Sequence, residues 1–244
     1  MATRVFDGWT ISPQSIEGLY EDYDFPNREV RHSTVDHGLP LGYWRAVGHS
    51  YTAFAVESFM DELAAKANMD PVEFRLRNTR MNPRLNRVIA VAGERLGAVR
   101  QGSNNHFGFA AHGSFGTYVA QVAEVAVTNA AIRVHRVICV VDCGLVVNPD
   151  IVRAQMEGGV IFGLTAALYG ELELENGAIK QSNFHDYPML RMDESPDIEV
   201  VLIHSTEEPS GVGETGLPPI APAVANGVFA ATGQRLRELP LKVA

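Results

Sequence analysis

Runs of apolar and β-branched residues in the second half of the chain predict a sheet. Each run has the length and composition that are typical of strands. The predicted strands cover residues 107–115, 118–127, 131–141 and 198–204. Gly116-Thr117, between the first two, indicates a bend or bulge. A hairpin is predicted over residues 171–184 around the Glu175-Asn176-Gly177 turn.

Helices are predicted where apolar residues recur every three or four positions after a capping residue. The predicted helices cover residues 50–68, 70–76, 83–96, 148–170 and 219–237. Ser50 and Asp70 are the predicted caps of the first two, because their side chains can accept hydrogen bonds from the free N–H groups of a first turn. Pro71 fits that first turn as well.

The first third of the chain gives weaker signals. Residues 29–35 alternate charged with apolar or small side chains, which predicts one strand. Because helices and strands do not alternate regularly, the pattern predicts an α+β fold of mixed sheets with packed helices. A polar connector at 101–106 is the predicted boundary between a first segment, residues 1–100, and a second, residues 101–244.

Composition and charge exclude several kinds of partner. A hydrophobic share of 46% is enough for a large core, and the net charge of −9 leaves no basic stripe for nucleic acid or an anionic membrane. The apolar stretch 158–170 is too short to cross a bilayer and is interpreted as a buried helix, and residues 1–10 lack the apolar core of a signal peptide. Cys139 and Cys143 match neither a disulfide framework nor a zinc site. A small molecule or a protein is the expected partner.

Several familiar chemistries lack their motifs. No lysine followed by serine or threonine completes a phosphate loop, and no GxGxxG joins a strand to a helix. The scattered histidines, such as His49 and His112, form no zinc-binding spacing and are interpreted as ordinary polar residues. Gly113-Ser114-Phe115-Gly116 lacks the spacing of a nucleophile elbow.

The segment Gly211-Val212-Gly213-Glu214-Thr215-Gly216-Leu217-Pro218-Pro219 carries the strongest chemical signal. Its glycines allow a ligand to approach the backbone closely, and the two prolines stiffen the entry to the helix that follows. Glu214 is therefore held on a rigid turn, where a catalytic base could lie. The alternative is a solvated acid near a helix N-terminus.

Five segments in order resemble the xanthine dehydrogenase and aldehyde oxidase family, especially its isoquinoline 1-oxidoreductase beta subunit branch. The first is Trp-Arg-Ala-Val-Gly-His-Ser at 44–50, continued at 54–63. The others are His-Gly-Ser-Phe-Gly-Thr-Tyr-Val-Ala-Gln at 112–121, the stretch 142–159, Asn-Phe-His-Asp-Tyr-Pro at 183–188, and 211–237. The resemblance covers residues 31–241.

The resemblance implies a molybdenum hydroxylase large subunit, a bacterial member of an oxidoreductase family. Such enzymes oxidise an N-heterocycle or an aldehyde with a water-derived oxygen at a molybdopterin centre, often a cytosine dinucleotide form, and pass electrons to [2Fe-2S] clusters on a partner subunit. The molybdenum is held through the pterin. Glu214 falls on the family's catalytic base, which takes the proton from the molybdenum-bound hydroxyl. The implied cofactor contacts are Arg45, Ala46, Gly48, Gln155 and Gly213, and the implied walls of the substrate cavity are Val47 and Phe115.

The chain also departs from the family pattern. Family large subunits are much longer and carry a glycine-rich, glutamine-containing cofactor motif that this sequence lacks, and the two cysteines cannot hold iron-sulfur clusters. We therefore expect the chain to be inactive alone and to act with the remaining part of a large subunit, or an equivalent chain, and with a small [2Fe-2S] subunit. The alternative is a non-catalytic, truncated or split subunit that serves as an assembly module. Substrate and compartment, bacterial cytoplasm or periplasm, stay open.

Overall fold

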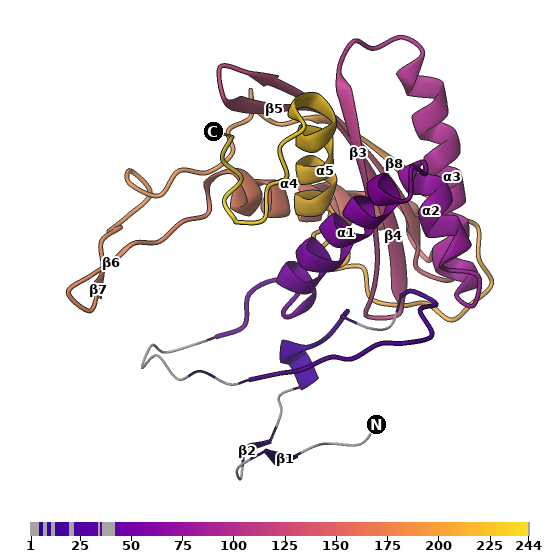
Figure 1. Ribbon diagram of the computed structural model, residues 1–244, viewed down its shortest axis with the longest axis horizontal. Helices are drawn as coiled ribbons and strands as arrows, with labels where there is room; N and C mark the ends of the chain where they lie inside the picture. The colour runs from indigo at the N-terminus through magenta and orange to yellow at the C-terminus, as the bar shows by residue number, and fades with distance from the viewer. Residues whose placement is uncertain are drawn as a thin grey trace.

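A four-stranded sheet in the order β3-β4-β5-β8 organises the fold of this computed structural model (Figure 1). The structure describes residues 5–6, 9–10, 13–19, 22–33, 35 and 42–243. The strands are β3 (His106–Ser114), β4 (Thr117–Thr128), β5 (Ala131–Asp142) and β8 (Asp197–Leu202). The first three run antiparallel to their neighbours, and β8 pairs parallel with β5. The four predicted strands are thereby confirmed.

Two tight hairpin turns hold the antiparallel strands in register. Phe115 and Gly116 join β3 to β4, and Asn129 and Ala130 join β4 to β5; all four residues have positive φ angles between 50° and 78°. Two residues in the left-handed region give the turn twist that matches the twist of the flanking strands. The predicted bend at Gly116 is therefore a two-residue turn.

Helices cover both faces of the sheet (Figure 1). They are α1 (His49–Lys66), α2 (Pro71–Arg77), α3 (Pro83–Arg100), α4 (Pro149–Tyr169) and α5 (Ile220–Thr232). Alternate residues of β4 face opposite ways: Ala120 and Val122 pack with α2 and α3, whereas Ala123 and Val125 pack with α4 and α5. This arrangement of mixed sheets and packed helices confirms the α+β class.

Capping explains where most helices begin. Asp70 accepts hydrogen bonds from the N–H groups of Val72 and Glu73, and Asn148 does the same for the first turn of α4. The predicted cap at Ser50 is wrong, because α1 begins at His49 and the Ser50 hydroxyl donates to the carbonyl of Val47 instead. The last helix ends at Thr232, earlier than predicted, because Gly233 takes a left-handed conformation that terminates it.

Two segments differ from the expected strand pattern. Residues 29–33 and 35 form no strand and are mostly exposed. Their alternating apolar side chains are therefore not packed on a buried face. The hairpin around Asn176-Gly177 is present but short, with β6 (Leu174–Glu175) and β7 (Ala178–Ile179). Two further short elements, the pair β1 (Val5–Phe6) with β2 (Trp9–Thr10) and the 3-10 helix η1 (Pro13–Ser15), precede the main fold.

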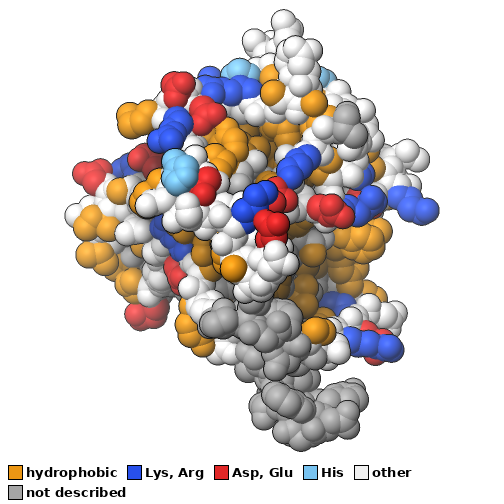
Figure 2. Space-filling view, turned by 90° about the vertical axis from the view of Figure 1, so that its left-hand side faces the viewer, with side chains coloured by type: hydrophobic (Ala, Val, Ile, Leu, Met, Phe, Trp, Pro, Cys, Tyr) orange, Lys and Arg blue, Asp and Glu red, His pale blue; other side chains and the backbone are white. Residues whose placement is uncertain are grey.

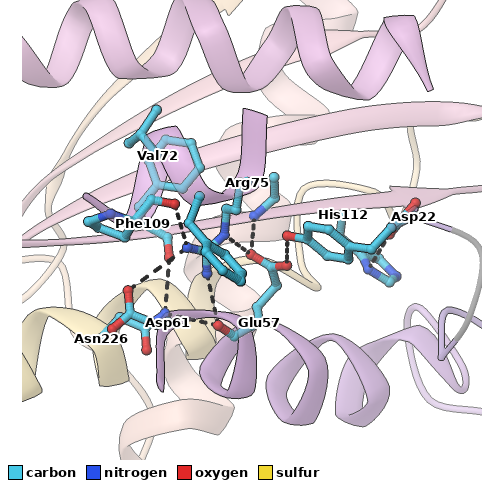
Figure 3. A network of polar contacts seen from close by, with 12 residues as sticks. Asp22, Glu57, Asp61, Val72, Arg75, Phe109, His112 and Asn226 are labelled. Carbon is cyan, nitrogen blue, oxygen red and sulfur yellow. Dashed lines mark hydrogen bonds and ion pairs between the residues drawn. The ribbon is translucent and has the colours of Figure 1, made fainter. Parts of the chain in front are cut away.

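Side chains rather than another strand cover the outer edge of β3 (Figure 3). The carboxylate of Glu57 accepts from the N–H of Ala111 at 2.8 Å, and Asp22 accepts from the N–H of Gly113 at 3.0 Å. The amide of Asn226 donates to the carbonyl of Phe109 at 3.0 Å. These three contacts satisfy backbone groups that an edge strand otherwise leaves open.

The helix α4 has one buried side. By length and composition alone it could cross a membrane, with a mean hydropathy of 1.2 over the relevant window. Met156, Val160 and Leu164 are fully buried in the core of this domain, which is the behaviour of a core helix. The predicted division between residues 100 and 101 stays a prediction; α3, before it, and β3, after it, share one hydrophobic cluster.

Candidate active site

Glu214 lies against the turn that carries Arg45 and Ala46, although 168 residues separate them along the chain. One carboxylate oxygen, Oε1, accepts a hydrogen bond from the Ala46 N–H at 3.0 Å. Arg45 donates from Nε and Nη2 to the carbonyl of Gly213, at 2.8 and 2.6 Å, and from Nη2 to Oε1 of Gln155 at 3.2 Å. The structure thus brings together the glycine-flanked acid, the arginine turn and the glutamine of α4.

The backbone of this turn takes an unusual conformation. Ala46 and Val47 have φ angles of 73° and 47°, a region that residues with a Cβ rarely occupy. Hydrogen bonds from the Val47 N–H to the Trp44 carbonyl and from the Ser50 hydroxyl to the Val47 carbonyl stabilise it. Strained backbone at such a position is a common property of functional sites, and here it directs the Ala46 N–H at Glu214.

Gly48 and Phe115 flank the same region. A Cβ on Gly48 would lie 1.9 Å from the carbonyl oxygen of Gln14, so the close packing of two backbone segments requires glycine here. The side chain of Phe115 is 41% exposed, and its carbonyl accepts from the Gly211 N–H at 3.3 Å, which places it at the start of the glycine loop. Their roles as cofactor contact and cavity wall stay predictions.

Two anchors of the glycine loop escaped the sequence interpretation. Gln121, fully buried on β4, donates from Nε2 to the Gly216 carbonyl at 2.7 Å. The hydroxyl of Thr117 contacts both the Ser210 hydroxyl and the Gly211 carbonyl at 2.7 Å. The signal for Gln121 is an amide side chain in the middle of an otherwise apolar strand, since a buried amide needs a partner.

Glycines also let α4 approach the loop closely. A Cβ on Gly159 would lie 3.1 Å from the backbone of Gly216, and a Cβ on Gly216 would lie 2.9 Å from the Met156 carbonyl oxygen. The backbone of α4 is therefore in direct contact with the segment that follows Glu214. This contact fixes Gln155, one turn before Gly159, relative to the acid.

Comparison with known proteins shows the family of this chain. Residues 49–196 match the family model of a molybdopterin cofactor-binding domain, and residues 8–79 match a second model of the same description. The chain belongs to this family. It is 39% identical over 91% of its length to the isoquinoline 1-oxidoreductase subunit beta of Brevundimonas diminuta, covering 29% of that protein. The expected membership of the xanthine dehydrogenase and aldehyde oxidase group is confirmed.

Two further relatives extend the picture. The chain is 31% identical over 92% of its length to a membrane-bound aldehyde dehydrogenase (pyrroloquinoline-quinone) of Gluconacetobacter polyoxogenes, covering 32% of that protein. Quinoline 2-oxidoreductase from Pseudomonas putida 86 has the same fold over 80% of this chain and 50% of its own, with a TM-score of 0.72 at 13% identity. The chain therefore spans about a third of the length of the two curated relatives.

The free polar groups of the site suit the edge of an organic cofactor. Within the described part of the chain, neither Oε2 of Glu214 nor Nε2 of Gln155 has a hydrogen-bond partner. A Cβ on Gly213 would meet nothing within 4 Å, so the backbone there borders open space. No three metal-ligating side chains cluster among the described residues.

We predict opposite effects for two neighbouring glycines of α4. Gly159→Ala should lower the free energy of unfolding by about 1–3 kcal/mol, because the added methyl meets the Gly216 backbone, which cannot yield cheaply. Gly158→Ala should be neutral or stabilise the protein by up to about 1 kcal/mol, because its Cβ meets nothing within 4 Å and alanine favours helix. Urea unfolding measures both. Equal losses for the two variants would contradict the close contact between α4 and the loop.

Proposed function

We propose that this chain is the part of a molybdenum hydroxylase large subunit that carries the general base, Glu214, for oxidation of an N-heterocycle or an aldehyde. The observation that supports this most directly is the hydrogen bond from the Ala46 N–H to Oε1 of Glu214, because it places the acid beside the turn that the family resemblance assigns to the metal. As an isolated chain it is expected to be inactive.

The two oxygens of Glu214 have different environments. Oε1 is fixed by Ala46, whereas Oε2 is unpaired in the described part of the chain, and the residue is only partly buried. A general base needs one oxygen within reach of the proton it removes and a carboxyl group held in a stable orientation. The molybdopterin centre, when bound, supplies the water-derived oxygen and takes up two electrons. Glu214 would hold the proton released at that step on Oε2.

The neighbouring residues would position the cofactor and the substrate. Gln155 accepts from Arg45 through Oε1 and keeps Nε2 for a ring nitrogen or carbonyl oxygen of the pterin, since an amide both donates and accepts. Arg45 fixes the Gly213 carbonyl, and so orients the peptide that precedes Glu214. Val47 and Phe115, both partly exposed next to this loop, would line the substrate cavity.

The names of the relatives support the proposed substrate class. The proteins that it resembles are named for an isoquinoline and for aldehydes, both of which offer an electrophilic carbon to a water-derived oxygen. We infer a molybdopterin cofactor in the cytosine dinucleotide form and electron transfer to [2Fe-2S] clusters on a small partner subunit. The remaining part of the large subunit would complete the cofactor site.

Labelled water tests this function. We predict that the assembled enzyme, this chain together with the rest of the large subunit and its electron-accepting partner, oxidises isoquinoline or benzaldehyde with a dye as oxidant. In ¹⁸O-water under argon the product should carry the label, because the oxygen comes from water. Mass spectrometry of the product measures it. Turnover that requires O₂ and gives unlabelled product, or no turnover with molybdenum present, would contradict the proposal.

An assembly role is the second candidate. It is favoured by exposed apolar side chains around the start of α4, where Leu145, Val147 and Ile151 are 55, 81 and 57% exposed. Apolar surface of this kind is typical of a protein interface. Figure 2 shows further hydrophobic side chains between charged ones on one face of the molecule. A chain that binds the rest of the subunit stably but yields an assembly without molybdenum and pterin would support this role over catalysis.

A further inference from the structure

Three buried polar side chains form a chain of contacts beside the proposed active site. Asp22, His112 and His49 are 4, 1 and 5% exposed. Oδ2 of Asp22 lies 3.1 Å from Nδ1 of His112, and Nε2 of His112 lies 2.8 Å from Nδ1 of His49 (Figure 3 shows the Asp22 end). They come from the segment before α1, from β3 and from the first turn of α1.

One hydrogen bond joins the two histidine rings. One of the facing nitrogens, Nε2 of His112 or Nδ1 of His49, donates it and the other accepts it. Oδ2 of Asp22 accepts a hydrogen bond from the Gly113 N–H at 3.0 Å and faces Nδ1 of His112 as an ion-pair contact. Burial, followed by the neighbouring His112, lowers the pKa of His49 to about 4, so this ring is neutral near pH 7. His49 is therefore a neutral ring held by its contact with His112.

The backbone of Gly18 closes this chain of contacts on one side. A Cβ at Gly18 would lie 2.5 Å from Cε1 of His112 and 3.0 Å from Nδ1 of His49, and its φ angle is 78°. The backbone at this position thus packs directly on both rings. A side chain at this position would therefore displace the rings, so the close packing requires glycine.

His49 connects this chain of contacts to two parts of the proposed site, the Ala46 turn and Phe115. It follows Gly48 directly, so a fixed His49 also fixes the turn whose Ala46 N–H donates to Glu214. Its ring packs edge-on against the ring of Phe115, with 5.1 Å between centroids. Phe115 in turn contacts Gly211 through its backbone.

We propose that Asp22, His112 and His49 are positioning residues for this reaction: their contacts with one another hold the Ala46 turn against Glu214, and the His49 ring supports Phe115 in the substrate cavity. The inference rests on the proposed function for its catalytic consequence. Its structural part, a rigid Ala46 turn, does not depend on the chemistry.

Two substitutions of His49 separate the two contacts. His49→Asn keeps an amide that can donate or accept near the position of Nδ1 but removes the ring, whereas His49→Phe keeps a ring and removes the hydrogen bond to His112. In the assembled enzyme His49→Phe should lower kcat by about 10- to 100-fold with little change in KM, because a displaced base costs rate. His49→Asn should raise KM for an aromatic substrate several-fold, about 3- to 10-fold, and keep kcat within about threefold.

Hydrogen exchange gives a readout that is independent of activity. In the peptide that contains Ala46, His49→Phe should speed amide exchange by on the order of tenfold, and His49→Asn should leave it close to the original rate. Asp22→Asn, which removes the carboxylate that faces Nδ1 of His112, should also speed exchange. If His49→Phe does not fold, Asp22→Asn provides the comparison.

The outcomes distinguish the two proposals. Equal effects of His49→Phe and His49→Asn on kcat, KM and exchange would overturn the positioning role, and so would unchanged exchange in both His49→Phe and Asp22→Asn. If Glu214→Gln stays active while the exchange pattern is as expected, the proposed function fails and the rigid turn stands. If Glu214→Gln is inactive while the His49 and Asp22 variants leave exchange unaffected, the proposed function stands and the positioning role fails.

Discussion

Glu214→Gln is expected to lower kcat/KM of the assembled enzyme by about 10²- to 10⁴-fold, the usual contribution of a general base. The amide keeps an oxygen that can accept from the Ala46 N–H, which the structure places 3.0 Å from Oε1. It cannot take up a proton. The loss should therefore lie in kcat, with KM and molybdenum content close to those of the original protein, as measured by steady-state kinetics and metal analysis.

A matched control separates the base from a general loss of negative charge. Glu94 is an exposed acid on α3, on the sheet face opposite α4 and α5, and Glu94→Gln should leave kcat/KM unchanged. Glu214→Gln with full molybdenum content and near-normal kcat would remove Glu214 from the proposed mechanism. A variant without molybdenum would instead assign Glu214 to cofactor binding.

Arg75→Met is expected to lower the free energy of unfolding by about 3–5 kcal/mol, the usual cost of removing one partner of a buried ion pair. Arg75 and Glu57 are fully buried, and Nε of Arg75 donates to Oε2 of Glu57 at 2.8 Å. Burial disfavours the charged guanidinium, but the Glu57 carboxylate outweighs it and raises the pKa of Arg75. Without Arg75, the donors left to the carboxylate among the described residues are the Tyr23 hydroxyl and the Ala111 N–H.

Two further variants test, by urea unfolding, whether the loss arises from the unpaired buried carboxylate of Glu57. Arg77→Met removes a guanidinium from the same helix, α2, but its partner Glu73 is about half exposed, so the loss should stay under about 1 kcal/mol. The double variant Arg75→Met/Glu57→Gln should recover part of the loss, because no unpaired charge remains. Similar losses in the free energy of unfolding for Arg75→Met and Arg77→Met would contradict the claim that removing one partner of the buried ion pair is more destabilising than removing one partner of an exposed pair.

Local chemistry explains why much of the fold could be predicted from sequence. Asp70 and Asn148 start helices because their own side chains accept hydrogen bonds from the N–H groups of the first turn. The strand at 29–35 was wrongly predicted because alternation alone does not provide a partner, and these residues meet none in the described structure. The helix α5 ends at Thr232, five residues before the predicted end at Arg237, because the left-handed conformation of Gly233 cannot be recognised from an apolar pattern.

The site depends on contacts that no local pattern encodes. Ala46 and Glu214 are 168 residues apart, so only the family resemblance placed them together. The sequence interpretation did not predict the buried ion pair between Arg75 and Glu57. A signal for it exists in the sequence, because Phe54, Glu57, Asp61 and Ala64 occupy one buried side of α1. A buried acid on such a helix face needs a cation and further hydrogen-bond donors. Arg75 on the next helix, α2, is the candidate cation that this reasoning indicates.

The side chains along the outer edge of β3 set a limit on how far the chain can be shortened at its beginning. A version that started after residue 33 would lack Asp22 and Tyr23, so the amide of Gly113 would lose its acceptor and Glu57 would lose a donor. An uncovered strand edge recruits strands from other molecules. Such a shortened protein would retain every helix and strand of the main sheet and would still self-associate into aggregates.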